Sequence, residues 1–193
     1  VAVTASEGPP PVAAAADEIV PPLIPTSAFA AQGNFRDAIL SPDGNTIAIQ
    51  MELAGQPTIV LFDAETRKPI QRFGMGEKVG LEWFSWASND RLLVGLSKSG
   101  DYFGTEALFT RLYVADRTTN EFRFIGNKSS ILTGDDVIYA APDGSHVLLN
   151  MQATPYETPS VFRFDLDKSR QGKQVEKPRA DIWNYFADSA GVV

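Results

Sequence analysis

Two copies of one turn sequence constrain the fold of this chain more than any other feature. Ser41-Pro42-Asp43-Gly44 lies between two apolar, β-branched runs, and Ala141-Pro142-Asp143-Gly144 lies between two more, about 100 residues later. Proline presets φ at the second position of a type I turn, aspartate tolerates the third, and glycine supplies the left-handed residue that starts the returning strand. Both segments therefore predict β-hairpins in one frame, which indicates an internal repeat.

Each repeat unit is predicted to hold four short strands. Three units are expected at about residues 35–73, 79–125 and 136–176, and a fourth opens at 181. The expected strands are 35–40, 46–52, 58–62 and 70–73, then 79–86, 92–96, 108–115 and 121–125, then 136–140, 146–151, 160–164 and 173–176. Weaker forms of the turn stand at Ser88-Asn89-Asp90 and Ser189-Ala190-Gly191, and an aspartate ends each third strand: Asp63, Asp116 and Asp165.

Four antiparallel strands per unit, repeated at a period near 50 residues, are typical of β-propeller blades. The sequence thus predicts an all-β chain, with an Ala/Pro-rich flexible leader at 1–25 and a partial propeller at 26–193. A sandwich or half-open barrel is the alternative. Because propellers usually close with about four to eight blades, three blades and the start of a fourth would leave open edges that favour self-association. We therefore expect a longer parent protein.

Composition narrows the function classes. The net charge of −7 comes without a basic stripe, which argues against nucleic-acid binding, and the absence of cysteine excludes disulfides and thiolate metal sites. No apolar run approaches the roughly 18 residues of a membrane helix, so no membrane span is expected. Leaders of this composition often follow a cleaved export signal. The expected location is periplasmic or secreted, with the cytoplasm left open.

The two turn segments, the lead-in Ile24-Pro25-Thr26-Ser27-Ala28-Phe29 and the following Phe35-Arg36-Asp37-Ala38 resemble the N-terminal propeller of prolyl oligopeptidase family serine peptidases. The resemblance implies a non-catalytic segment that gates or contacts peptide substrate. It would serve a C-terminal α/β-hydrolase domain, absent from this chain, that carries a Ser-Asp-His triad. Similar hairpins occur in Tol-type periplasmic propellers, so a binding module without enzymatic activity is the alternative. A three-blade protein that assembles with its own copies is a third.

The chain offers no complete catalytic machinery. His146 is the only histidine and is expected to be an ordinary strand residue. Ser97, in Gly95-Leu96-Ser97-Lys98-Ser99, lacks the closing glycine of a nucleophile elbow and is expected in a loop. The pairs Asp135-Asp136 and Asp165-Leu166-Asp167 lack the pattern of a calcium loop and are interpreted as solvated turn acids. We predict no catalytic residue, metal site or cofactor in this chain.

One connection carries the candidate contact residues. Residues 97–107 are expected to form a long loop between the second and third strands of the second unit. There Tyr102 and Phe103 stand between two glycines, which predicts an exposed tip, and Tyr156 occupies the matching loop of the third unit. These three aromatic residues are the predicted contacts with substrate or a partner domain. The alternative is that the loop folds onto its own blade.

Two further patterns have ordinary explanations. Asn127-Lys128-Ser129 fits the N-glycosylation acceptor pattern, which short sequences often match by chance. Trp83, Trp86 and Trp183 fall in expected first strands, where they are predicted to pack between blades rather than to form a ligand cage.

Overall fold

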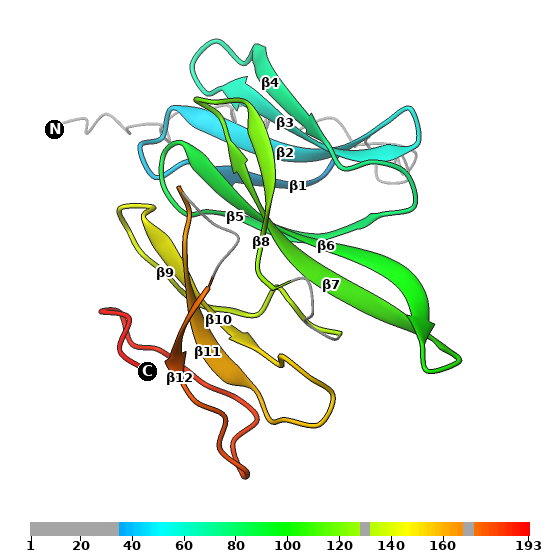
Figure 1. Ribbon diagram of the computed structural model, residues 1–193. Helices are drawn as coiled ribbons and strands as arrows, with labels where there is room; N and C mark the ends of the chain where they lie inside the picture. Colours follow the sequence, from blue (N-terminus) through cyan, green and yellow to red (C-terminus); the bar gives the residue numbers. More distant parts are fainter. Residues whose placement is uncertain (1–34, 128–131, 168–171) are drawn as a thin grey trace, which may run out of the picture. The chain divides into compact units, whose positions relative to one another are not determined.

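A computed structural model of the protein describes residues 35–127, 132–167 and 172–193. Within these ranges the chain forms three four-stranded antiparallel sheets and no helix (Figure 1). In each sheet the strands pair in the order in which they follow along the chain. This arrangement confirms the predicted all-β fold of four-stranded propeller blades. The predicted leader at 1–25 lies outside the described residues.

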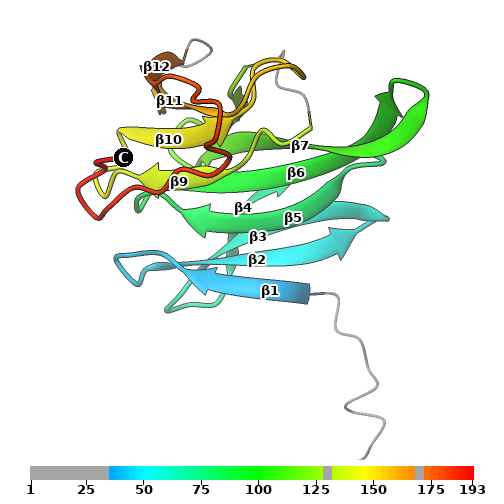
Figure 2. The ribbon, with the colours of Figure 1, turned by 90° about the horizontal axis from the view of Figure 1, so that it is seen from below.

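We name the sheets blade 1, blade 2 and blade 3 (Figure 2 gives a second view). Blade 1 contains β1 (Phe35–Leu40), β2 (Thr46–Leu53), β3 (Gln56–Asp63) and β4 (Pro69–Gly74). Blade 2 contains β5 (Gly80–Trp86), β6 (Arg91–Tyr102), β7 (Thr105–Asp116) and β8 (Glu121–Ile125). Blade 3 contains β9 (Val137–Ala140), β10 (His146–Met151), β11 (Ser160–Asp165) and β12 (Lys173–Glu176).

The repeated turn has the predicted geometry. Gly44 and Gly144 have φ of 75° and 68°, and the Gly44 amide donates to the Ser41 carbonyl over 2.9 Å. The Asp43 carboxylate stabilises the turn by accepting hydrogen bonds from the Ser41 hydroxyl and the Asn45 amide at 2.6 and 3.0 Å. Glycine avoids the steric cost that a Cβ would meet at these angles. The turn chemistry predicted from sequence is therefore the chemistry that joins β1 to β2.

Alternation along β6 explains how the blades pack. Leu92, Val94 and Leu96 point into a core shared with blade 1, whereas Leu93 points into a core shared with blade 3. All four side chains are at most 5% exposed. Successive side chains of a strand point to opposite faces, so an apolar run such as this one makes a strand buried on both sides. The middle blade is thereby held between two apolar cores.

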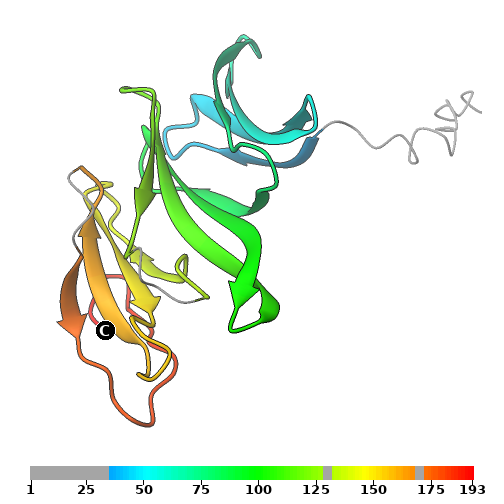
Figure 3. The same ribbon diagram turned by 45° about the vertical axis from the view of Figure 1, so that its right-hand side comes forward.

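The expected loop at 97–107 is wrong, because these residues continue the strands. β6 and β7 pair without a break from Arg91↔Asp116 to Tyr102↔Thr105. Phe103 and Gly104 alone make the turn, with φ of 51° and 82°, the signature of a tight two-residue hairpin. Pairing of β5 with β6 ends at Ser97, so the end of the hairpin extends beyond its sheet (Figure 3). We call residues 98–109 the hairpin extension.

Residues 181–193, where a fourth unit was predicted to open, pack against blade 3 but contain no assigned strand. Tyr185 is 8% exposed and donates its hydroxyl to the Lys177 carbonyl over 2.9 Å. The amide of Gly191 donates to the Asp188 carbonyl over 3.0 Å, the same turn bond as at Gly44. Trp183 is 60% exposed, so its predicted role in packing between blades is wrong. The apolar contacts come instead from its neighbours.

Candidate functional site: the hairpin extension and its groove

An aromatic strip runs along one face of blade 2, from the hairpin tip to the core shared with blade 1. Its six residues are Phe103, Tyr102, Phe109, Arg111, Tyr113 and Phe122. At the tip, the Tyr102 ring lies 4.8 Å from that of Phe103 and 6.4 Å from that of Phe109, both edge to face. Alternation along β7 places Phe109, Arg111 and Tyr113 on the same face. The strip is thus a consequence of strand register.

Glycine makes room for one ring of the strip. A Cβ added to Gly100 would lie 2.9 Å from Cε2 of Phe109, so the ring covers the glycine from the neighbouring strand. An aromatic side chain over a cross-strand glycine protects backbone that would otherwise be bare, and it fixes the register. The sequence analysis took this glycine as a sign of a mobile tip. In the structure Gly100 pairs with Ala107 inside the hairpin.

A groove of about 500 Å³ opens beside the base of the hairpin extension. Its walls come from the end of blade 1 and the strip face of blade 2: Gly74, Met75, Gly76, Val79, Leu96, Ser97, Lys98, Phe109, Arg111, Tyr113 and Phe122. This lining has two cationic side chains and no carboxylate, in a chain with 24 acidic and 17 basic residues. The groove is therefore a positively charged, aromatic hollow on an acidic protein.

The two cations differ in how they are held. Arg111 Nη1 donates to the Thr110 and Leu132 carbonyls at 2.6 and 3.2 Å, and its guanidinium carbon lies 5.9 Å from the Phe109 ring centre. Burial lowers the pKa of Arg111, but a guanidinium remains protonated at neutral pH. Lys98 is exposed, on the strand next to Phe109. The site thus combines an anchored arginine with a mobile ammonium group.

The predicted contact residues are only partly brought together. Phe103 is 76% exposed and Tyr102 half-buried beneath it, whereas Tyr156 is 89% exposed in the connection between β10 and β11. Among the described residues, Tyr156 makes no ring contact with the other two. Sequence reasoning missed Lys98, Phe109 and Arg111. Their spacing of two along β7, and the pairing of Lys98 with Phe109, would have indicated one face had the strands been recognised.

Other sequence candidates take structural roles. Ser97 lies in β6 rather than in a loop, is 4% exposed and donates its hydroxyl to Glu82. His146 begins β10, where its Nδ1 lies 2.8 Å from the Ser145 hydroxyl oxygen. Burial and the charge of Arg163 lower the pKa of His146, so the imidazole is neutral at pH 7. Neither residue has a hydrogen-bonded carboxylate–imidazole–serine chain in the part of the protein described here.

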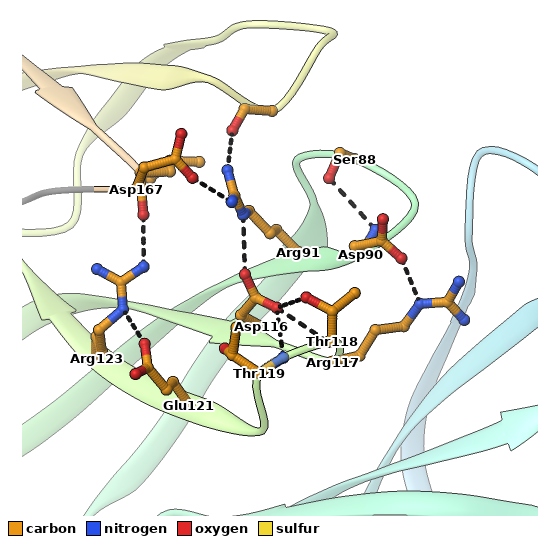
Figure 4. A network of polar contacts seen from close by, with 12 residues as sticks. Ser88, Asp90, Arg91, Asp116, Arg117, Thr118, Thr119, Glu121, Arg123 and Asp167 are labelled. Carbon is orange, nitrogen blue, oxygen red and sulfur yellow. Dashed lines mark hydrogen bonds and ion pairs between the residues drawn. The ribbon is translucent and has the colours of Figure 1, made fainter.

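The acidic pairs are not simply solvated turn acids. Asp135 is 9% exposed and accepts hydrogen bonds from Trp83 Nε1, over 2.8 Å, and from the Thr110 hydroxyl. Asp167 pairs with Arg91 of the neighbouring blade, within the polar network of Figure 4. Among the described residues, no cluster of three potential metal-ligating side chains occurs. The acids therefore stabilise contacts between blades.

Part of one remaining pattern lies outside the described residues, because Lys128 and Ser129 of the acceptor pattern are not described. Trp83 and Trp86 pack against the two inter-blade cores, as predicted. In the described ranges, no helix is long and apolar enough to span a membrane.

Fold and groove together define an all-β protein of propeller blades with a cationic, aromatic surface site. No protein-family model and no curated protein matches the chain. Among solved structures it is similar to an uncharacterized protein from Listeria monocytogenes EGD-e, with a TM-score of 0.50 and 12% identity over 75% of this chain and 41% of that one.

Two further structures are more distant. The β-propeller domain of the Trilobed protease from Pyrococcus furiosus has a TM-score of 0.42 and 13% identity, over 74% of this chain and 42% of that one. A protein provisionally classed as a conserved lipoprotein from Clostridium novyi NT has a TM-score of 0.41 and 11% identity, over 76% and 87%. This chain spans about two fifths of the first two structures. At such identities the likeness concerns the fold alone.

Proposed function

We propose that this chain is a non-catalytic propeller segment that contacts peptide substrate through the hairpin extension. In the parent protein it would gate or contact substrate for a C-terminal α/β-hydrolase domain of the prolyl oligopeptidase type. The observation that carries the proposal is the hairpin that extends beyond its sheet and ends in Phe103, 76% exposed. The family resemblance of the turn segments and of the lead-in supplies the hydrolase partner.

The hairpin is suited to such a contact because its tip is apolar and its stem is rigid. Two strands paired without a break hold Tyr102 and Phe103 in place, so binding costs little conformational entropy. Covering an exposed phenylalanine contributes about 2 kcal/mol. An extended peptide that packs against the tip would therefore gain from one residue roughly a thirtyfold increase in affinity.

A binding measurement tests the contact. A fluorescent peptide amide, Gly-Gly-Leu-Phe-NH2, is titrated with the chain and with the Phe103→Ser variant, and anisotropy is recorded. We expect at least a tenfold loss for Phe103→Ser, since about 2 kcal/mol of apolar contact is removed. Phe186→Ser is the matched control, because Phe186 is 82% exposed but lies outside the hairpin. Equal affinity of both variants would contradict the proposed contact.

The hydrolase partner is tested separately by reading the encoding frame beyond Val193. A Gly-x-Ser-x-Gly segment followed by aspartate and histidine supports the peptidase assignment. A stop codon after further blades would leave a propeller binding module without a hydrolase. The periplasmic or secreted location, and self-association through open blade edges, remain predictions. The size of the chain in solution is the measurement that checks self-association.

A further inference from the structure

We propose that the groove beside the hairpin extension is a subsite for a peptide carboxylate. Lys98 and the charge of Arg111 would receive the carboxylate, while Phe109 and Tyr113 pack against the apolar side chain next to it. This inference rests on the proposed function, because the same hairpin presents both the tip and the groove, and it adds the class of peptide that the site selects.

Charge is the first argument. The three hollows described in this protein differ in sign. The one beside β9 contains Asp135 and Asp136, and the one beside β1 mixes Arg36 with Glu52 and Glu82. The hairpin groove alone among these three is lined by cations without a carboxylate. On a chain of net charge −7, a local positive site attracts an anion against the general field.

The placement of the cations is the second argument. Lys98 pairs directly with Phe109, and Arg111 lies two residues further along β7 on the same face. Such diagonal neighbours lie roughly 7–8 Å apart across a sheet, close enough for one carboxylate to interact with both. The hydrogen bonds from Arg111 to two backbone carbonyls fix its position, and the flexible lysine can close onto the ligand.

Apolar lining is the third argument. Met75 and Leu96 are 7% and 5% exposed and form the apolar part of the groove with the rings of Tyr113 and Phe122, stacked 5.1 Å apart. Gly74 and Gly76 lack side chains that would fill the wall. A hollow of about 500 Å³ accommodates one or two residues of a peptide, and a mostly apolar lining with a few polar groups is typical of ligand sites.

Three peptides of matched size test the assignment. Gly-Gly-Leu-Phe with a free carboxylate, its C-terminal amide, and the amide of Gly-Gly-Glu-Phe are titrated by anisotropy with the whole 193-residue chain. The free acid is expected to bind about tenfold more tightly than its amide, a difference of about 1.4 kcal/mol. The advantage should shrink as salt rises, because the lysine is exposed. The glutamate peptide separates a side-chain carboxylate from a terminal one.

Charge reversal supplies the decisive variants. Lys98→Glu should remove the preference for the acid, whereas Lys173→Glu, with the same change of charge at an exposed site on β12, should keep it. Circular dichroism confirms that each variant is folded. Equal affinity for all three peptides, or the same preference in Lys98→Glu, overturns the subsite. If that happens while Phe103→Ser still weakens all three, the proposed function stands; if no peptide binds, both proposals fail.

Discussion

Arg91 and Asp116 join the blades from inside the polar network, with Nε 3.1 Å from Oδ2. The same guanidinium donates to the Gly144 carbonyl of blade 3 over 2.9 Å and pairs with Asp167 (Figure 4). Arg91 is 21% exposed and Asp116 only 4%. One arginine at the start of β6 thus connects its own sheet to the turn of the next.

Replacing this arginine should destabilise the protein strongly. Arg91→Ala leaves Asp116 as a buried carboxylate without its charged partner and removes two contacts to blade 3. We expect a loss of about 3 kcal/mol in the free energy of unfolding, measured by urea denaturation. The control is Arg36→Ala, since Arg36 pairs with Glu52 at 3.6 Å on the surface and its loss should cost about 0.5 kcal/mol or less.

Stability should fall in acid partly through Asp116. Burial raises the pKa of Asp116, but hydrogen bonds from Thr118, Thr119 and Arg91 outweigh it and lower the pKa to about 2. A carboxyl with a lowered pKa stabilises the fold above its unfolded pKa, near 3.8, and this contribution of about 2 kcal/mol is lost as pH falls towards 2.

Substitution isolates that contribution. Asp116→Asn should unfold more easily than the natural chain at pH 7, and the difference should narrow between about pH 4 and pH 2. Asp181→Asn, at an exposed carboxylate, should show no such difference. A gap that stays constant down to pH 2 would contradict the role given to the ionised Asp116.

A ring over glycine also joins blade 2 to the segment before blade 3. Trp83 lies opposite Gly95, where an added Cβ would lie 2.2 Å from the indole nitrogen that donates to Asp135. Gly95→Ala should therefore displace the indole and break that bond, costing about 2–3 kcal/mol. Thermal unfolding and tryptophan fluorescence measure both effects. Gly74→Ala meets nothing within 4 Å and serves as the control.

The blades could be predicted from sequence because their signals are local. Gly44 and Gly144 need positive φ, and alternation along each strand shows which side chains face a core. The hairpin extension could not be predicted, because Gly100 reads locally as a loop residue. Only its partner strand, which places Phe109 over it, makes it a residue of a stable strand.

The candidate site was predicted in the same uneven way. Tyr102 and Phe103 are adjacent in sequence, so their exposure at a tip could be inferred from composition alone. Lys98 and Arg111 are 13 residues apart and share a groove only because β6 and β7 pair in one register. Asp135 looked like a turn acid, since nothing in its neighbourhood along the chain indicates the indole that it accepts from. Long-range pairing was the missing information.

The chain by itself should not react as a serine hydrolase. Ser145 is the serine nearest to a catalytic pair, with its hydroxyl oxygen 2.8 Å from Nδ1 of His146. A nucleophile also needs an acid that orients the imidazole, and among the described residues no carboxylate hydrogen-bonds that ring. A fluorophosphonate probe should therefore leave the purified chain unlabelled, as judged by intact mass, while labelling a control serine peptidase. Stoichiometric labelling of Ser145 or Ser97, lost on substitution to alanine, would show that the segment is catalytic.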